Sequence, residues 1–132
     1  MTRLSRDEIV NGLTELIGPQ NVLTDQKLLQ EYSMDRFRKL ESIFGIYPCP
    51  LPAAIAQVRN TEDVSQVMKF MNEHNINCVP RTGGSATEGG LETRVTNSVV
   101  VDGSKMNKTI KIDETNMLVT AQCGVNLERL EN

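Results

Sequence analysis

The glycine-rich stretch Pro80-Arg81-Thr82-Gly83-Gly84-Ser85-Ala86-Thr87-Glu88-Gly89-Gly90 decides the fold class of this chain. It holds four glycines within eight residues and directly follows an apolar run that we predict to be a strand. Because glycine allows positive φ angles, consecutive N–H groups can converge on one point, and such a nest of donors binds phosphate oxygens. Hydroxyl groups of Thr82, Ser85 and Thr87 and the charge of Arg81 would assist. The stretch predicts a phosphate or pyrophosphate site, with an ordinary surface loop as the alternative.

Two familiar phosphate-binding motifs do not fit this stretch. Residues 84–89 have the glycine spacing of a Walker A loop, but Gly90-Leu91 stands where Lys-Ser/Thr is required. The G-x-G-x-x-G spacing of a dinucleotide fingerprint is absent, and residues 90–98 show no helical periodicity. An anion would therefore be held by the loop itself and not by the end of a helix.

The segments on either side of the loop predict a βαβ unit. Residues 53–58 are typical of a strand, and a helix is predicted from Asn60 or Thr61 to about His74. Residues 76–79 are predicted as a short strand, parallel to the first. Residues 98–101, Ser-Val-Val-Val, indicate a further buried strand beyond the loop.

The two ends of the chain carry local signals of their own. Residues 109–112 and 117–121 predict a hairpin around a four-residue loop, followed by a helix over 125–130. At the start, Ser5 and Glu8 form a capping box for a helix over residues 6–17, and a short helix is predicted from Asp25 to Tyr32. Residues 33–52 lack a clean period. They contain apolar side chains that we expect to be buried, Ile43, Phe44, Ile46 and Tyr47.

One core is predicted to cover the βαβ sheet. Its expected members are apolar residues on the strands and on one face of the central helix: Ile55, Val58, Val64, Val67, Met68, Met71, Val79, Val99 and Val101.

Composition excludes several classes of protein. The 132 residues carry a net charge of −3, which argues against a partner nucleic acid. No apolar run approaches the roughly 20 residues of a membrane span, and no signal peptide is visible, so we expect a cytoplasmic protein. Cys49, Cys78 and Cys123 form no metal-binding spacing, and we expect reduced, mostly buried thiols. With His74 as the single histidine, we predict no metal site and name no catalytic residue.

Several segments resemble, in order, those of the FAD-linked oxidase family, also called the vanillyl-alcohol oxidase or PCMH-type family. Residues 80–85 resemble its pyrophosphate loop, and residues 52–64 its first strand and helix. Residues 99–108 resemble the strand after the loop, and residues 120–125 a strand that ends in a glycine turn. The region before residue 52 is similar to the lead-in of the glycolate oxidase or D-lactate dehydrogenase branch.

The resemblance implies an α+β fold, the first subdomain of a PCMH-type FAD-binding domain, with a βαβ unit, an antiparallel hairpin and N-terminal helices. It divides the chain into an N-terminal helical lead-in, residues 1–51, and the first half of the FAD-binding domain, residues 52–132. Family members continue well beyond such a stretch. We therefore expect an N-terminal fragment, inactive by itself, whose parent oxidises a 2-hydroxy acid by hydride transfer to FAD.

The resemblance also assigns the cofactor site. Backbone N–H groups of residues 82–86 would face the FAD pyrophosphate. Some family members attach the flavin covalently through a histidine where this chain has Ser85, so non-covalent FAD is expected. The implied cofactor-binding residues are Arg81, Thr82, Gly83, Gly84, Ser85, Ala86 and Thr87.

Two further expectations concern partners. The fragment should bind FAD weakly or not at all, because a pyrophosphate loop contacts only the middle of the cofactor. Open sheet edges near residues 98–101 or 117–121 should pair with another chain and give a homodimer or aggregates. The alternative function is a non-enzymatic module that binds phosphate or a nucleotide, or a remnant that acts with a partner chain.

Overall fold

A computed structural model of the chain describes residues 2–35, 38, 45 and 49–131. The predicted burial of Ile43, Phe44, Ile46 and Tyr47 lies outside these residues. The elements, in chain order, are α1 (Arg6–Ile17), the 3-10 helix η1 (Pro19–Asn21), β1 (Val22–Leu23), α2 (Gln26–Tyr32), β2 (Ala54–Gln57), α4 (Thr61–Glu73), β3 (Cys78–Arg81), β4 (Val99–Asp102), β5 (Thr109–Asp113), β6 (Leu118–Ala121) and α5 (Leu127–Glu131). The predicted α+β fold is confirmed, helices and hairpin included.

A four-stranded sheet with the order β1-β2-β4-β3 forms the centre of the fold. Strands β2, β4 and β3 are parallel, and β1 is antiparallel to β2. The two strands of the predicted βαβ unit are therefore parallel, but β4 lies between them. Both flanking strands pair with Val99, through Ala54 on one side and Cys78 on the other.

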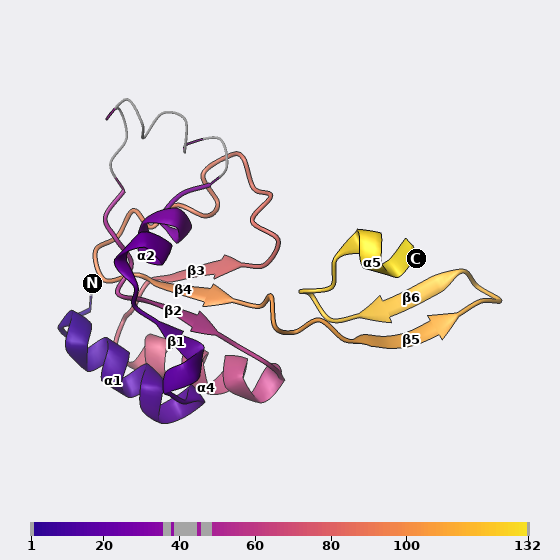
Figure 1. Cartoon of the computed structure of the whole chain (residues 1–132). Coiled ribbons are helices and arrows are strands. Elements are labelled where there is room, and N and C mark those ends of the chain that lie inside the picture. Colours follow the sequence, from indigo (N-terminus) through magenta and orange to yellow (C-terminus); the bar gives the residue numbers. More distant parts are fainter. Residues whose placement is uncertain (1, 36–37, 39–44, 46–48, 132) are drawn as a thin grey trace.

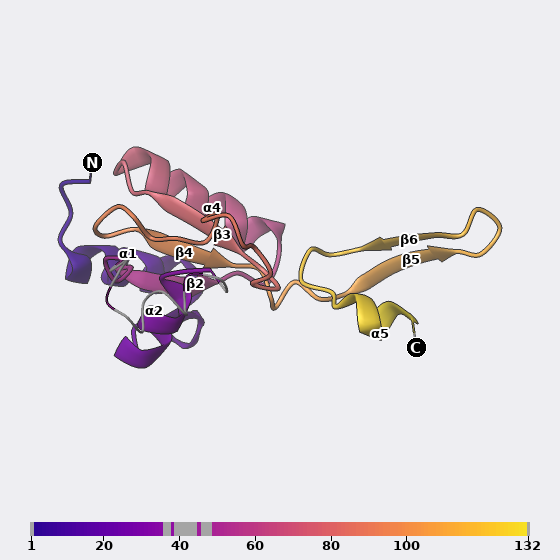
Figure 2. The same cartoon turned by 90° about the horizontal axis from the view of Figure 1, so that it is seen from above.

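Helices cover both faces of this sheet (Figures 1 and 2). On one face α1 and α4 pack against the sheet through Ile9, Leu13, Val67 and Met71. On the other face, α2 packs through Leu29 against three strand residues: Ile55, Val79 and Val100. Because strand side chains alternate between faces, the prediction of one shared core is wrong for Ile55 and Val79. They belong to a second cluster, under α2.

Local signals account for the start and the end of α4. Asn60 is the N-cap, and its Oδ1 accepts a 2.9 Å hydrogen bond from the N–H of Asp63. At the other end Asn75 has φ 52°, and the N–H of Ile76 donates to the carbonyl of Met71 over 2.8 Å. This bond closes a Schellman cap. Because Ile76 belongs to this cap, β3 begins at Cys78, two residues later than predicted.

Met68 is a second correction to the predicted core. Its side chain is 42% exposed, whereas Val67 beside it is fully buried. The face of α4 that meets the sheet is centred on Val67 and Met71. Met68 lies instead beside β3, at the edge of the sheet, where its Sδ is 3.7 Å from the Sγ of Cys78.

The hairpin β5–β6 extends away from the layered part of the molecule, with α5 beside its base (Figures 1 and 2). Gly124 packs closely at this base, where its N–H donates to the carbonyl of Met106 over 2.9 Å and a side chain would collide with Gly103. The hairpin strands are exposed, as predicted for residues 117–121. The same prediction for residues 98–101 is wrong, because β4 is buried between β2 and β3.

The three cysteines are free thiols, as expected, but the prediction that most of them are buried is wrong. Cys49 and Cys78 are half-buried and Cys123 is exposed. In the described part of the chain, every helix is too short or too polar to cross a membrane. The same residues contain no group of three or more His, Cys, Asp or Glu that could hold a metal ion.

Candidate functional site: the glycine loop at the carboxyl edge of the sheet

The three parallel strands end together at one edge of the sheet. Gln57, Arg81 and Asp102 are the last residues of β2, β3 and β4, and the register pairs Asp102 with both of the others. Alternation along each strand puts all three side chains on the α2 face, one step beyond the apolar cluster of that face. Ligands of open α/β sheets bind outside this carboxyl edge, and the glycine loop begins there, directly after Arg81.

Asp102 is buried at this edge and fully engaged. Its Oδ1 accepts a 2.9 Å hydrogen bond from the N–H of Ser104, and its Oδ2 accepts one of 3.3 Å from the Nε2 of Gln57. Tyr32, at the end of α2, lies near this carboxylate. Burial raises the pKa of the Tyr32 hydroxyl, and the negative charge of Asp102 raises it further. The tyrosine is therefore neutral at physiological pH.

The loop after Arg81 leaves its backbone donors available. Within the described part of the chain, no N–H group from Thr82 to Glu88 donates a hydrogen bond to another residue. The loop borders a cavity of about 200 Å³, lined by Pro80, Arg81, Thr82, Gly84, Ser85, Ala86 and Leu91. The predicted unpaired amides are thus present in the described structure, and five of the seven residues predicted to share one concave face line this cavity. Gly83 and Thr87 do not line this cavity.

Arg81 brings a positive charge into the loop. Its Cζ lies 4.3 Å from the centroid of the Tyr32 ring. Its Nη1 is buried and has no hydrogen-bond partner among the described residues. A buried polar atom without a partner is rare in folded proteins, and a guanidinium nitrogen is a donor only. The unpaired Nη1 therefore indicates that an anionic acceptor belongs beside it.

Gly84 is shaped to the same guanidinium. Its φ is +67°, in the region that favours glycine, and a Cβ there would lie 2.8 Å from the Nη2 of Arg81. The backbone of the loop consequently folds close over the charged side chain. Glycine is favoured here by its conformation, and a Cβ would also require the Arg81 guanidinium to shift.

Two glutamates near the loop are either exposed or paired with arginines. Glu88 is exposed to solvent. Glu92 is buried, but its Oε1 accepts a 3.0 Å hydrogen bond from the Nε of Arg38 and its Oε2 one of 2.5 Å from the Nε of Arg94. Glu92 is thus paired with other arginines, and Arg81 contributes a positive charge to the lining of the cavity.

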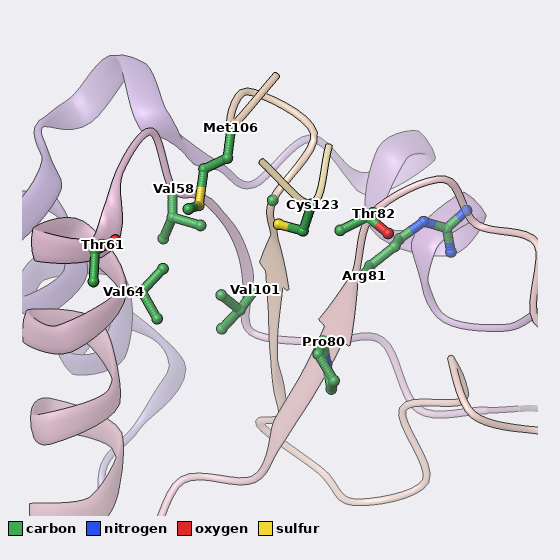
Figure 3. Close-up of a pocket in the computed structure, with 10 residues that line it drawn as sticks. Val58, Thr61, Val64, Pro80, Arg81, Thr82, Val101, Met106 and Cys123 are labelled. Atoms are coloured by element: carbon green, nitrogen blue, oxygen red, sulfur yellow. The ribbon is translucent and has the colours of Figure 1, made fainter. Parts of the chain in front are cut away.

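A second cavity, of about 340 Å³, lies on the α4 side of the same edge (Figure 3). Figure 3 shows apolar side chains of Val58, Val64 and Val101 around it, while the Arg81 side chain points away from them. Its full lining is Val58, Thr61, Val64, Pro80, Arg81, Thr82, Val101, Gly103, Met106 and Cys123. The edge thus carries an apolar hollow on one side and the hollow bordered by the glycine loop on the other.

Residues 52–132 match a protein family described as FAD binding domain. The chain belongs to this family. A curated relative is named as an FAD-linked oxidoreductase, which agrees with the family match, confirms the resemblance stated from the sequence and identifies FAD as the cofactor.

Similar proteins agree with this assignment. The chain is 60% identical over 129 residues to the uncharacterized FAD-linked oxidoreductase YgcU of Escherichia coli (strain K12), an alignment that covers 98% of this chain and 27% of YgcU. It is 31% identical over 132 residues to the mitochondrial D-lactate dehydrogenase (cytochrome) 1 of Saccharomyces cerevisiae, covering 96% of this chain and 22% of that enzyme. The chain thus spans about a quarter of the length of these relatives.

A solved structure supports the fold. The crystal structure of p-cresol methylhydroxylase with substrate bound has a TM-score of 0.77 to this chain at 24% identity, covering 95% of this chain and 23% of that protein. The predicted PCMH-type fold of the FAD-binding domain is therefore confirmed.

The residues at the loop fit FAD. The cofactor presents a pyrophosphate, and the loop presents unpaired amides, a buried unpaired Nη1 of Arg81 and a glycine fold that brings them close. Sequence reasoning found the loop but missed Tyr32 and Asp102. For Asp102 a signal was present, an acid directly after three valines of a buried strand. No local pattern connects Tyr32 with Arg81.

Proposed function

We propose that residues 81–87 hold the pyrophosphate of non-covalent FAD, in a flavin-dependent oxidoreductase that oxidises a 2-hydroxy acid. The observation that carries this proposal is the buried Nη1 of Arg81 beside the N–H groups from Thr82 to Glu88, all of them without a hydrogen-bond partner among the described residues. Seven residues are proposed as contacts: Arg81, Thr82, Gly83, Gly84, Ser85, Ala86 and Thr87. The pattern of donors suits an anion with several oxygens.

The chain's own residues bind and orient the cofactor. Each hydrogen bond from the loop to a charged phosphate oxygen contributes roughly 1.5–3 kcal/mol. Arg81 supplies the positive charge, and the hydroxyls of Ser85 and Thr87 supply further donors. FAD held by these residues would supply hydride-accepting redox chemistry for a substrate and would return the electrons to an acceptor. None of the described residues is assigned to the reacting atoms.

The substrate class rests on the relatives. The yeast relative is named as a D-lactate dehydrogenase, and lactate is a 2-hydroxy acid. Because the chain spans about a quarter of that enzyme, the residues that contact substrate are expected in the rest of such a protein. By itself the chain is proposed to bind FAD weakly and to be inactive, since the loop hollow of about 200 Å³ encloses only the centre of the cofactor.

A chimera tests the proposal under conditions where the whole site is present. Residues 1–132 replace the aligned part of YgcU, to which they are 60% identical. The purified chimera should show flavin absorbance in the visible range, and a 2-hydroxy acid added without oxygen should bleach it. Absence of flavin would contradict the cofactor site. Bleaching only by donors that lack a 2-hydroxy acid group would contradict the substrate class.

Two glycine variants of the chimera locate the cofactor within it. Gly84→Ala adds a methyl group at φ +67° and 2.8 Å from Arg81, so FAD affinity should fall at least about tenfold, the effect of about 1.4 kcal/mol. Gly90→Ala adds the same methyl group where only the Cβ of Ala86 is near, at 3.8 Å. It should change affinity by less than about twofold. Equal affinities in both variants would exclude the loop as the pyrophosphate site.

A further inference from the structure

Residues at the end of α2 and just beyond it contact both ends of the glycine loop. Tyr32 is the last residue of α2, and its ring lies under the Arg81 guanidinium at 4.3 Å. Arg81 is the residue from which the loop begins. A flat aromatic face attracts a cation electrostatically, and the attraction is strongest where the pair is shielded from water. The ring therefore restrains a guanidinium whose Nη1 has no hydrogen-bond partner among the described residues.

Three residues further along, Asp35 holds the other end of the loop. Its side chain is fully buried, and its Oδ2 accepts a 2.5 Å hydrogen bond from the N–H of Gly89. Gly89 has φ +86°, a conformation that favours glycine. The carboxylate thus fixes the backbone at the point where the unpaired stretch of amides ends.

Ser33 joins these two contacts to the chain beyond the loop. Its carbonyl accepts a 2.9 Å hydrogen bond from the N–H of Thr93 and one of 3.2 Å from the Thr93 hydroxyl. Residues 32–35 therefore contact the loop at its beginning, at its end and just after it. All of these contacts join positions about 50 to 60 residues apart in the sequence.

We infer that Tyr32 and Asp35 are positioning residues for the cofactor, an inference that rests on the proposed role of the loop in binding the FAD pyrophosphate. Neither needs to touch the phosphate. Tyr32 holds the charge of Arg81 inside the hollow, and Asp35 holds Gly89 so that the amides between these two points face the same hollow.

The energetic reason lies in the freedom of the loop. Residues 82–88 make no backbone hydrogen bonds within the described structure, so nothing inside this segment restrains it. Fixing the backbone of one residue costs roughly 1–2 kcal/mol. With both ends already held, part of that ordering has taken place in the folded chain, and binding need not supply it. Loss of either contact should therefore weaken binding without removing a donor.

The experiment is an NMR titration of the ¹⁵N-labelled 132-residue chain with ADP. ADP carries the pyrophosphate group, and an NMR titration can measure weak binding. Tyr32→Leu removes the aromatic face and should weaken ADP binding roughly threefold to thirtyfold. Tyr32→Phe keeps the ring without the hydroxyl and should bind within about twofold of wild type. Asp35→Asn weakens the acceptor for Gly89 at nearly constant volume. It should weaken binding several-fold and speed hydrogen exchange of the Gly89 amide.

The same spectra report whether each variant is folded. Folded Tyr32→Leu and Asp35→Asn chains that bind ADP as well as wild type would overturn the inference. If Tyr32→Leu does not fold, the affinity and exchange rate of Asp35→Asn decide. A wild-type chain in which ADP shifts no amide between Thr82 and Thr87 would overturn the proposed role of the loop, and the positioning role with it. ADP binding that is weaker in Tyr32→Leu but close to wild type in Tyr32→Phe would support both the role of the loop and the positioning role.

Discussion

Val67 and Met68 are neighbours on α4, but Val67 is fully buried against the sheet while Met68 is 42% exposed beside its edge strand. The same substitution can therefore be compared at a buried position and at an exposed one. Burying an aspartate without a partner costs several kcal/mol, whereas the same side chain at an exposed position stays hydrated.

Val67→Asp should unfold the chain. A loss of about 3–5 kcal/mol is expected, a large part of the stability of a domain of this size. Met68→Asp, the matched control, should keep a cooperative transition within about 1 kcal/mol of wild type. Thermal melts followed by circular dichroism measure both. Cooperative melting of Val67→Asp near the wild-type temperature would show that α4 presents another face to the sheet.

The pH dependence of stability should reveal the ion pair at the start of α4. The Nε of Arg59 lies 2.8 Å from the Oδ2 of Asp63, and hydrogen bonding to Arg59 holds the pKa of the Asp63 carboxyl below its usual value. Because the folded pKa is lower than the unfolded value of about 3.9, this contribution is complete above that pH. It is lost as the pH falls through the folded pKa.

Asp63→Asn should therefore destabilise the chain at pH 7 and much less at pH 3. The loss should not exceed about 1 kcal/mol, because the Arg59 side chain is 46% exposed and screened by water. Urea melts at the two pH values measure it. Glu62→Gln removes a charge from the same turn of the helix without touching this pair. An equal loss for Asp63→Asn at both pH values would mean that the charge contributes nothing.

Much of the fold could be predicted because its signals are local. The capping box of Ser5 and Glu8 and the N-cap Asn60 each act within three residues, and both helices begin as expected. The position of β4 between β2 and β3 could not be predicted, because it depends on pairing between segments that are distant in the sequence. The boundary proposed between residues 51 and 52 stays a prediction.

The site divides in the same way. The free amides of the loop follow from its glycine content and could be predicted. The support from Tyr32 and Asp35 could not, because Asp35 and Gly89 are 54 residues apart and become neighbours only when α2 packs on the sheet. Burial of single side chains was the least accurate, since Met68 differs from Val67 only by its angle on the helix.

Thiol reactivity should distinguish the three cysteines. Burial raises the pKa of the Cys78 and Cys49 thiols, which lowers the fraction of reactive thiolate, and both are half-buried. Cys123 is exposed at the border of the apolar cavity. It should react with a disulfide reagent about tenfold faster than the other two. Cys123→Ser should abolish the fast phase, and a fast phase that persists would show that Cys49 or Cys78 is more accessible than the structure indicates.

The hairpin β5–β6 carries apolar side chains that nothing in the described structure covers. Ile112 and Val119 lie opposite each other across the two strands, and both are exposed. Met117 at the turn is 90% exposed. An isolated two-stranded hairpin is marginally stable in water, and exposed apolar strands pair readily with other chains.

We therefore expect the 132-residue chain to self-associate through this hairpin, and sedimentation velocity at rising concentration measures it. The double variant Ile112→Lys with Val119→Glu replaces an apolar cross-strand pair by an opposite-charge pair, which keeps the hairpin but places two charges in the middle of its apolar surface. It should sediment as a monomer where wild type forms a dimer or larger species. Met68→Lys, which charges an exposed apolar residue on α4, should associate like wild type. A wild-type chain that stays monomeric at high concentration, or a double variant that associates equally, would show that the hairpin is not the contact surface.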